Sequence, residues 1–421
     1  MLDIKFVKEN IALAKQSQKF RGKNINDIDK LLLLDTEKKA AISNLEDLRA
    51  KQNALGKAIP KADNEEKQKL LKELKVLSNN VEEAKAKTDK QSKKFEDLAK
   101  TVDNIIEGAP AGGEDDFKII EYIGEKRNFE KEGIKIKDHL DLAQDLGILD
   151  TVRGAKVSGS RFFYLLGQGA ELELALERLA IDTALEEGLT PVITPTLVLP
   201  EVMEGTGFLG EHSAEVYKLL DDDLYLVGTS EVALAGLHKD EIIDLSKGAK
   251  SYAGISTCYR REAGSYGKDT RGIIRVHQFN KIEMFTYSPV EDSEKEHKRI
   301  LSIEKKLLDK MELPYRVIDI AAGDLGSSAA RKFDCEAFLP SQNRYLELTS
   351  TSNCTTYQAR RLNIRYKDSN GKNLHCATQN GTLATTRWIV AILENHQQSD
   401  GSIKLPKALS KYMGGKEFIS K

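Results

Sequence analysis

The stretch Cys258–Phe285, CYRREAGSYGKDTRGIIRVHQFNKIEMF, decides the fold that we expect for the whole chain. Two runs rich in Ile, Val, Phe and Tyr, Ser251–Tyr259 and Ile273–Phe285, flank a loop that contains three glycines. β-branched and aromatic residues favour strands, and glycine favours turns. The stretch therefore predicts an antiparallel strand pair with a long connecting loop, and we expect the chemistry of the protein at this loop.

Charged side chains crowd this predicted hairpin. They are Arg260, Arg261, Glu262, Lys268, Arg271, Arg275 and Glu283. Arginine offers a planar fork of donors that matches phosphate oxygens, so several arginines on one hairpin point to a polyphosphate ligand. A solvated, charged surface hairpin is the alternative, because such hairpins are common.

Glu283 stands among the apolar residues Ile282, Met284 and Phe285. An ionised carboxylate in such surroundings is costly unless a cation pairs with it. The sequence leaves two kinds of partner open: the ammonium group of a substrate, or a side chain such as Lys281 or an arginine.

The run R-x-E-A-G-S-Y-G-x-D-T-R-G-x-x-R-x-H-Q-F-x-K-x-E, which ends at Glu283, resembles motif 2 of the class II aminoacyl-tRNA synthetases, and the seryl-tRNA synthetase version in particular. The resemblance implies ATP binding by Arg260, Arg261, Glu262 and Val276, with the ring of Phe279 stacked on adenine. It also implies that Glu283 binds the ammonium group of serine and that Arg260 lies beside the amino acid.

The composition bounds the class of protein. A chain of 421 residues is long enough for two or more domains, and 40% hydrophobic with 31% charged residues is typical of a globular protein. The net charge of -2 gives no general attraction to nucleic acid, so a nucleic-acid partner would need local basic patches.

Cysteine spacing and the N-terminus exclude other classes. The four cysteines form no C-x-x-C pair, so we expect no zinc site and reduced thiols. The start, MLDIKFVKEN, lacks the pattern of a secretory signal, and no apolar run has the length of a membrane span. We expect a cytoplasmic protein with no membrane partner.

A second strong pattern covers about Asp27 to Ile106, which holds one proline and one glycine. Apolar and small residues recur at alternating spacings of four and three, the period of a coiled-coil seam. In the second half these are Leu70, Leu74, Leu77, Val81, Ala84, Thr88, Gln91, Phe95, Leu98, Val102 and Ile105, and in the first half Leu31, Leu34, Ala41, Leu45, Leu48, Leu55 and Ile59, interrupted by Lys38 and Gln52.

Between the two halves, Gly56 and Pro60 oppose a continuous helix, and Asp63 can cap the next one. We therefore predict an antiparallel helical hairpin. A dimerising coiled coil or a scaffold rod is the alternative that the pattern allows. The resemblance implies instead a tRNA-binding arm, with phosphate contacts from lysines near its tip: Lys51, Lys57, Lys61, Lys67, Lys69 and Lys72.

The linker Glu107–Asp116, EGAPAGGEDD, marks the predicted domain boundary. Beyond it, a helix over Ala170–Glu187 and a strand that ends at Pro195 are similar to motif 1 of the family. The resemblance implies that these elements form the interface of a homodimer.

A shorter run carries candidate residues for serine binding. A strand over Asp223–Gly228 leads to Thr229, Ser230 and Glu231, which are similar to the family's serine-binding T-x-E loop. Taken alone, Thr229 or Ser230 would cap a helix over Val232–His238, and both interpretations can hold together.

After a predicted helix over Ser293–Met311, strands are expected over Tyr315–Ile320, Asp334–Leu339 and Tyr345–Thr349. The last one runs into Glu347, Leu348, Thr349 and Ser350, which resemble the family's E-[IL]-[ST]-S motif at the ATP site. The resemblance implies that Glu347 and Ser350 hold Mg²⁺ with ATP, which suits the preference of Mg²⁺ for oxygen ligands.

The run NGTLATTRWIVAILENHQ, from Asn380 to Gln397, resembles motif 3. It places Arg387 near the start of an amphipathic helix, where a γ-phosphate would meet a guanidinium and the helix dipole. The interval from Asn380 to Leu383 is one residue shorter than the common pattern, and we assign the serine contact there to Thr382.

One motif is rejected. Gly205, Gly207 and Gly210 spell G-x-G-x-x-G, but a dinucleotide site needs a buried strand before these glycines and a helix after them. Pro200 and Glu201 precede them, and Glu211 follows, so neither context is present.

Together the residues and the resemblance predict an α+β protein. We expect a tRNA-binding domain over 1–107, with an antiparallel coiled-coil arm over about 27–106, and a class II antiparallel-sheet catalytic domain over 117–421. The implied function is that of a bacterial-type serine–tRNA ligase that uses ATP, Mg²⁺ and L-serine to charge serine tRNA, with Arg260, Arg387 and Glu347 as catalytic residues.

Two rival functions stay open, as does charging of selenocysteine tRNA. A related enzyme could aminoacylate a carrier protein, although the long arm argues against this. The chain could also be a coiled-coil interaction module with a degenerate catalytic domain, although the presence of Arg260, Glu262, Glu283 and Arg387 together argues against it.

Overall fold

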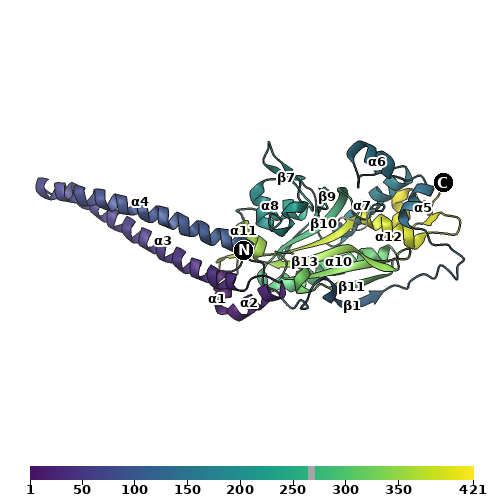
Figure 1. Ribbon diagram of the computed structural model, residues 1–421, viewed down its shortest axis with the longest axis horizontal. Coiled ribbons are helices and arrows are strands. Elements are labelled where there is room, and N and C mark those ends of the chain that lie inside the picture. The colour runs from purple at the N-terminus through teal and green to yellow at the C-terminus, as the bar shows by residue number, and fades with distance from the viewer. Residues whose placement is uncertain (264–270) are drawn as a thin grey trace. The chain divides into compact units, whose positions relative to one another are not determined.

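The computed structural model describes residues 1–263 and 271–421, without the side chains of residues 211 and 212. The chain divides into two compact units, Met1–Ile105 and Ile106–Lys421 (Figure 1). The predicted loop residues Gly264, Gly267 and Lys268 lie outside the described residues.

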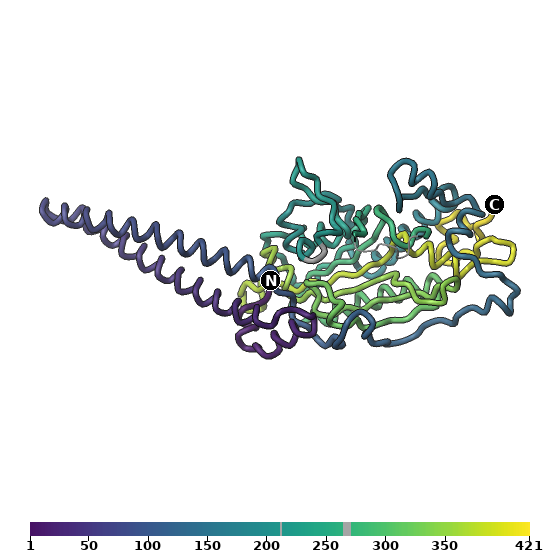
Figure 2. Tube along the Cα trace, in the orientation of Figure 1, coloured from purple at the N-terminus to yellow at the C-terminus, as the bar shows by residue number. Residues whose placement is uncertain are grey.

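The first unit is helical. Its elements are α1 (Ile4–Glu9), α2 (Ile11–Phe20), α3 (Asn26–Ala58), η1 (Ile59–Lys61) and α4 (Asn64–Thr101), and α3 and α4 lie side by side as a hairpin (Figure 2). The side chain of Asp63 accepts hydrogen bonds from the backbone N–H groups of Glu65 and Glu66 at 3.1 and 3.0 Å, so the predicted cap is confirmed. Two details of the prediction were wrong. α3 continues through Gly56 to Ala58, because one glycine costs a long helix only about 1 kcal/mol, and α4 ends at Thr101, before the last predicted seam residues.

The seam of the hairpin accommodates the two polar residues that interrupt it. The ammonium of Lys38 lies 4.7 Å from the ring centroid of Phe95, and Gln52 Nε2 donates to Ser78 Oγ at 3.0 Å. Thr88 Oγ1 lies 3.1 Å from the carbonyl oxygen of Ala41 on the facing helix. Each of these polar groups at the seam therefore has a partner on the other helix.

The second unit is built on an eight-stranded sheet in the order β1-β11-β12-β13-β16-β10-β9-β4. All neighbours are antiparallel except β4 and β9, which are parallel. The strands are β1 (Lys118–Ile123), β4 (Thr190–Ile193), β9 (Lys250–Tyr259), β10 (Gln278–Ser288), β11 (Tyr315–Asp319), β12 (Arg331–Leu339), β13 (Arg344–Thr355) and β16 (Ala377–Thr385).

Helices cover both faces of this sheet (Figure 1). The main core lies between the sheet and α7 (Gln168–Glu186), α10 (Ser293–Lys310) and α12 (Arg387–His396). A second core joins Phe285 and Tyr287 to α9 (Glu231–Gly236) and α11 (Tyr357–Arg361). Because side chains alternate along a strand, Ile282 and Met284 enter the main core, while Lys281 and Glu283 share the face of Phe285.

Smaller elements surround the sheet. The helices are α5 (His139–Asp145), α6 (Thr151–Ser158), α8 (Pro200–Thr206) and α13 (Lys407–Ser410). Four small sheets contain β2 (Leu149–Asp150) with β3 (Tyr164–Leu165), β5 (Leu197–Val198) with β7 (Leu224–Leu226) and β6 (Lys218–Leu219), β15 (Asn373–His375) with β14 (Arg365–Lys367) and β8 (Ile242–Ile243), and β17 (Ile403–Lys404) with β18 (Phe418–Ile419). Among the described residues, no helix combines the length and apolarity needed to cross a bilayer.

The deciding hairpin forms, but its return strand begins later than predicted. β9 pairs with β10 from Gln278 onward, whereas residues 271–277 form turns and bends. Ile273 and Ile274 are buried all the same, and the N–H of Ile273 donates to His139 Nε2 at 3.3 Å rather than to β9. The apolar run therefore reflects burial of a loop and not an extension of the strand.

Candidate active site

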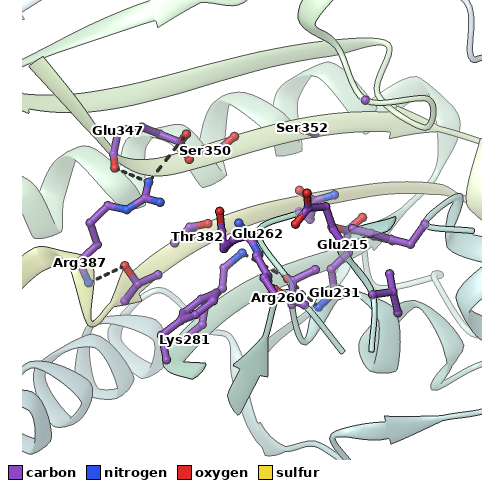
Figure 3. Close-up of a pocket in the computed structure, with 18 of the residues that line it drawn as sticks. Glu215, Glu231, Arg260, Glu262, Lys281, Glu347, Ser350, Ser352, Thr382 and Arg387 are labelled. Carbon is purple, nitrogen blue, oxygen red and sulfur yellow. Dashed lines mark hydrogen bonds and ion pairs between the residues drawn. The ribbon is translucent and has the colours of Figure 1, made fainter. Parts of the chain in front are cut away.

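A cavity of about 550 Å³ opens on the face of the sheet that carries Lys281 (Figure 3). It is lined by segments far apart in the sequence: α8, the start of α9, the residue that follows β9, β10, β12, β13, β16 and the first residue of α12. Eleven of the predicted site residues line it: Thr229, Glu231, Arg260, Glu262, Val276, Phe279, Glu347, Leu348, Ser350, Thr382 and Arg387.

Four predicted residues do not line the cavity. The hydroxyl of Ser230 donates to the carbonyl of Gly254 at 3.3 Å, and the hydroxyl of Thr349 donates to Glu304 Oε2 at 2.9 Å, on the α10 side of the sheet. Arg261 is exposed, with its guanidinium 5.9 Å from the ring centroid of Tyr217. Glu283 lies fully buried behind the cavity wall.

Arg387 and Glu347 meet at one side of the cavity (Figure 3). Arg387 is the first residue of α12, as predicted, and its Nη1 donates to the carbonyl of Glu347 at 2.9 Å and lies 4.0 Å from Glu347 Oε2. Burial acts to raise the pKa of Glu347, but the positive charges of Arg387 and Lys332 outweigh it and lower that pKa. An ionised carboxylate whose side chain is 46% exposed is therefore available to a ligand here, beside the hydroxyl of Ser350.

Arg260 forms the centre of the cavity wall. Its Nε donates to the carbonyl of Gly228 at 3.2 Å, and its guanidinium carbon lies 5.2 Å from the ring centroid of Phe279. Glu262 holds a left-handed backbone with φ of 51° and accepts a bond from Arg275 Nη1 at 3.1 Å. A guanidinium beside a flat aromatic ring suits a ligand with both a phosphate and a planar base.

Lys281 provides the cation beside Glu283 that the sequence left open. Its Nζ lies 2.6 Å from Glu283 Oε2 and 3.2 Å from Thr229 Oγ1. Thr382 Oγ1 donates to the same carboxylate oxygen at 3.4 Å. Burial raises the pKa of Glu283, and Lys281 opposes that rise.

Glu231 is a second buried carboxylate at this end. Its Oε1 accepts a bond from Gln358 Nε2 at 2.7 Å, and Gln358 Oε1 accepts one from Thr378 Oγ1 at 2.7 Å. Burial and the nearby charge of Glu283 raise the pKa of Glu231 to about 7. The N–H of Glu231, the first residue of α9, donates to Thr229 Oγ1 at 3.2 Å, whereas the side chain of Ser230 at the cap position accepts no bond from the helix; Thr229 also lines the cavity.

Comparisons with known proteins agree along the whole chain. The model of the seryl-tRNA synthetase N-terminal domain matches residues 1–106, and that of the class II tRNA synthetase core domain (G, H, P, S and T) matches residues 215–396. The serine–tRNA ligase of Pseudarthrobacter chlorophenolicus is 56% identical over 100% of this chain and 99% of its own. The chain belongs to the seryl-tRNA synthetase family.

Solved structures of seryl-tRNA synthetases are similar over the same span. The enzyme of Pyrococcus horikoshii, solved in complex with ATP, has a TM-score of 0.91 and 39% identity, and covers 100% of this chain and 99% of its own. The cytoplasmic enzyme of Naegleria fowleri, in complex with AMP, has a TM-score of 0.88 and 33% identity, with the same coverage. The predicted family, the class II fold with a helical arm and the serine–tRNA ligase function are therefore confirmed.

Sequence reasoning missed several residues that line the cavity of this seryl-tRNA synthetase. Lys332, with its Nζ 3.3 Å from Asp334 Oδ2, reaches the cavity from β12, and no motif in the sequence singled it out. Glu215, which accepts a bond from the N–H of Ala263 at 3.2 Å, follows an irregular segment that gives no pattern. The glycines of the rejected G-x-G-x-x-G run lie in and after α8, and Gly207, with φ of 98°, lines the cavity.

Glu347 and Ser350 together offer an ionised carboxylate and a hydroxyl at the cavity wall. Within residues 1–263 and 271–421, no group of three or more His, Cys, Asp and Glu side chains could hold a metal ion. Two oxygen ligands of this kind fit Mg²⁺, which keeps waters and shares phosphate oxygens rather than occupying an all-protein cage.

Proposed function

We propose that this cavity binds L-serine beside ATP, forms seryl-adenylate and passes the seryl group to the 3′ end of serine tRNA. One observation carries the proposal. A single cavity brings Arg260 and Arg387, two cations suited to phosphates, together with the buried carboxylate Glu231, which suits an ammonium group, and the carboxylate of Glu283 is buried behind the wall of the same cavity.

The chemistry needs no nucleophile from the protein. A carboxylate oxygen of serine attacks the α-phosphorus of ATP, and the bond to the pyrophosphate oxygen breaks. A hydroxyl of the tRNA 3′-terminal ribose then attacks the seryl carbonyl carbon, and AMP leaves. Arg260 would neutralise the α-phosphate and Arg387, at the start of α12, the γ-phosphate, so positioning and charge neutralisation lower the barrier.

Phe279 would present its ring to adenine, and Glu262, Val276 and Leu348, which line the cavity with it, are the other proposed ATP contacts. The predicted side-chain contacts of Arg261 and Thr349 with ATP are not proposed again, because neither side chain lines the cavity. Glu347 and Ser350 would hold Mg²⁺, which supplies positive charge to the phosphates when it is bound.

We assign the selection of serine to Thr229, Glu231 and Thr382, which line the cavity, and to Glu283 behind them, with Arg260 at the carboxylate. The hydroxyl of Ser230, which was also predicted to bind serine, donates to the carbonyl of Gly254 instead. A pocket that hydrogen-bonds the serine hydroxyl leaves buried polar groups unpaired with alanine, which can cost a factor of roughly 10⁴ or more in discrimination. We therefore expect alanine to be rejected without hydrolytic editing.

We further infer that residues 1–107 form a tRNA-binding domain and residues 117–421 the catalytic domain of a homodimer in the cytoplasm. The six tip lysines are all exposed, as phosphate contacts require. Around α7 and β4, Leu174 and Ile193 are 65% and 85% exposed, which favours burial against a second copy.

Amino-acid-dependent ATP–pyrophosphate exchange tests the proposal. We expect exchange with serine and none with alanine, threonine or no amino acid. Arg260→Ala should lower kcat/KM by about a hundredfold or more, since a charge that stabilises the transition state is removed. Arg153→Ala, a change on the exposed face of α6, is the matched control. Exchange near wild type in Arg260→Ala would show that the phosphate assignment is wrong.

A further inference from the structure

Lys281 is buried inside the proposed serine site, although no role was predicted for it there. Its side chain is 8% exposed, and its ammonium joins two residues from different elements, Thr229 before α9 and Glu283 on β10. Figure 3 shows it beside Arg260 and Thr382 at the floor of the cavity. A buried lysine is costly, so its paired placement marks a functional position.

The contact with Lys281 affects the hydrogen-bonding role of Thr229. Thr229 Oγ1 accepts from Lys281 Nζ and from the N–H of Glu231, both at 3.2 Å. A hydroxyl has two acceptor lone pairs and one hydrogen. With both lone pairs engaged, the hydroxyl of Thr229 can only donate toward a ligand in the cavity.

Lys281 also affects the protonation of Glu283. Glu283 is buried, which raises its pKa, and Lys281 opposes that rise together with Arg260 and the hydroxyl of Thr382. The other ionisable groups whose charges act on this pair are Glu231 from α9, Cys258 from β9, Glu304 from α10 and Glu347 from β13. Three of these are carboxylates, so Lys281, together with Arg260, supplies the positive charge that favours the ionised form of Glu283.

We propose that Lys281 is a positioning residue of the serine site: by bridging Thr229 and Glu283 it keeps the Glu283 carboxylate ionised and sets the affinity for the ammonium group of the amino acid. The inference rests on the proposed function. It assigns Lys281 no contact with ATP and no part in the bond-making step.

Steady-state exchange kinetics of Lys281→Met between pH 6 and 8.5 test this role. Without Lys281, more of Glu283 is protonated at neutral pH, and a neutral carboxyl attracts an ammonium group less. We expect KM for serine to rise about tenfold at pH 7, the scale of one lost contact to a charged group, and the excess to shrink toward pH 8.5. KM for ATP and kcat should change by less than about threefold, because Arg260 and Arg387 remain in place.

Two further variants serve as a second test of the charge and as a control. Lys281→Gln retains hydrogen-bond donors without the charge, so it should reproduce the pH-dependent defect, and it carries the test if the Met variant fails to fold. Lys298→Met, an exposed residue of α10 with Nζ 2.6 Å from Glu294, is the control and should behave as wild type.

An unchanged or lowered KM for serine overturns the inference, as does a fall in kcat together with a rise in both KM values that does not depend on pH. A wild-type chain without serine-dependent exchange would overturn the proposed function itself.

Discussion

The hydroxyl of Thr386 donates a hydrogen bond to Glu173 Oε1 at 2.6 Å, and Arg387 is the next residue in the chain. The same hydroxyl accepts a bond from the N–H of Asn280 at 3.2 Å, on β10 between Phe279 and Lys281. One buried side chain thus ties α7, β10 and the start of α12 together. This junction therefore holds Arg387, on α12, in place relative to Phe279 and Lys281, on β10.

Replacing Thr386 by Val should therefore impair catalysis. The change leaves the Asn280 N–H and the Glu173 carboxylate without their partner and frees Arg387 to shift. We expect kcat for pyrophosphate exchange to fall about 10- to 100-fold, since small misplacements of catalytic groups are costly. Thr386→Ser keeps the hydroxyl and should stay near wild type. Equal activity of the Val and Ser variants would contradict the role of the hydroxyl.

Glu173 makes the stability of the second unit depend on pH. Burial raises the pKa of Glu173 to about 7, so its proton is held more tightly in the folded than in the unfolded chain. The stabilisation from this group is complete below the ordinary pKa of 4.5 and is lost as the pH rises toward 7. Glu173→Gln should therefore stabilise the protein by about 1–3 kcal/mol at pH 8, with little gain below pH 4.5. Urea unfolding at both pH values measures the difference, and an equal effect at both would refute the assignment.

Gly272 holds the segment that returns to β10 against α5. Its φ is 74°, and a Cβ there would lie 1.9 Å from His139 Nε2. His139 Nδ1 in turn lies 3.2 Å from Glu394 Oε1, so the ring cannot easily yield. We expect Gly272→Ala to cost about 3 kcal/mol or more, and to raise KM for ATP because Val276 and Phe279 follow.

Gly248→Ala is the matched control for this change. Gly248 also has a positive φ, of 104°, but a Cβ there meets nothing within 4 Å. It should cost only about 1 kcal/mol, which is the effect of the backbone conformation alone. A similar decrease in the free energy of unfolding for both alanine variants would rule out the clash with His139.

The exposed lysines of the arm allow a test of tRNA binding. Changing the six tip lysines to Gln should raise KM for tRNA and reduce the salt slope of binding by about 0.9 for each phosphate that is no longer neutralised. Pyrophosphate exchange without tRNA should be unaffected. Six exposed lysines in the other half of α4 form the control set: Lys85, Lys87, Lys90, Lys93, Lys94 and Lys100. A larger rise in KM for tRNA in the control set would show that the tRNA-binding surface does not lie at the tip.

Local patterns predicted the elements whose signal is contained in neighbouring residues. The period of the arm and the cap at Asp63 follow from spacing and capping alone, whereas the helix that begins at Arg387 was placed by the resemblance to motif 3. The return strand was placed too early, because Ile273 and Ile274 are buried by α5 and not by strand pairing.

Contacts between distant segments could not be predicted in the same way. Nothing near Glu173 indicates that it meets Thr386, and nothing near Glu215 indicates a cavity. Resemblance named many of the residues that line the cavity, but it could not decide which cation pairs with Glu283. That pairing depends on the alternation of side chains along β10, which places Lys281 and Glu283 on one face.

The polar contacts across the arm fix the register of its two helices. Lys38 on Phe95, Gln52 on Ser78 and Thr88 on Ala41 coincide in a single alignment of α3 and α4. A slip of one heptad, about 10 Å along the axis, would separate all three pairs at once. These contacts therefore keep the tip of the hairpin at one distance from its base, and a tRNA bound at the tip lysines, as we propose, would be held at that distance.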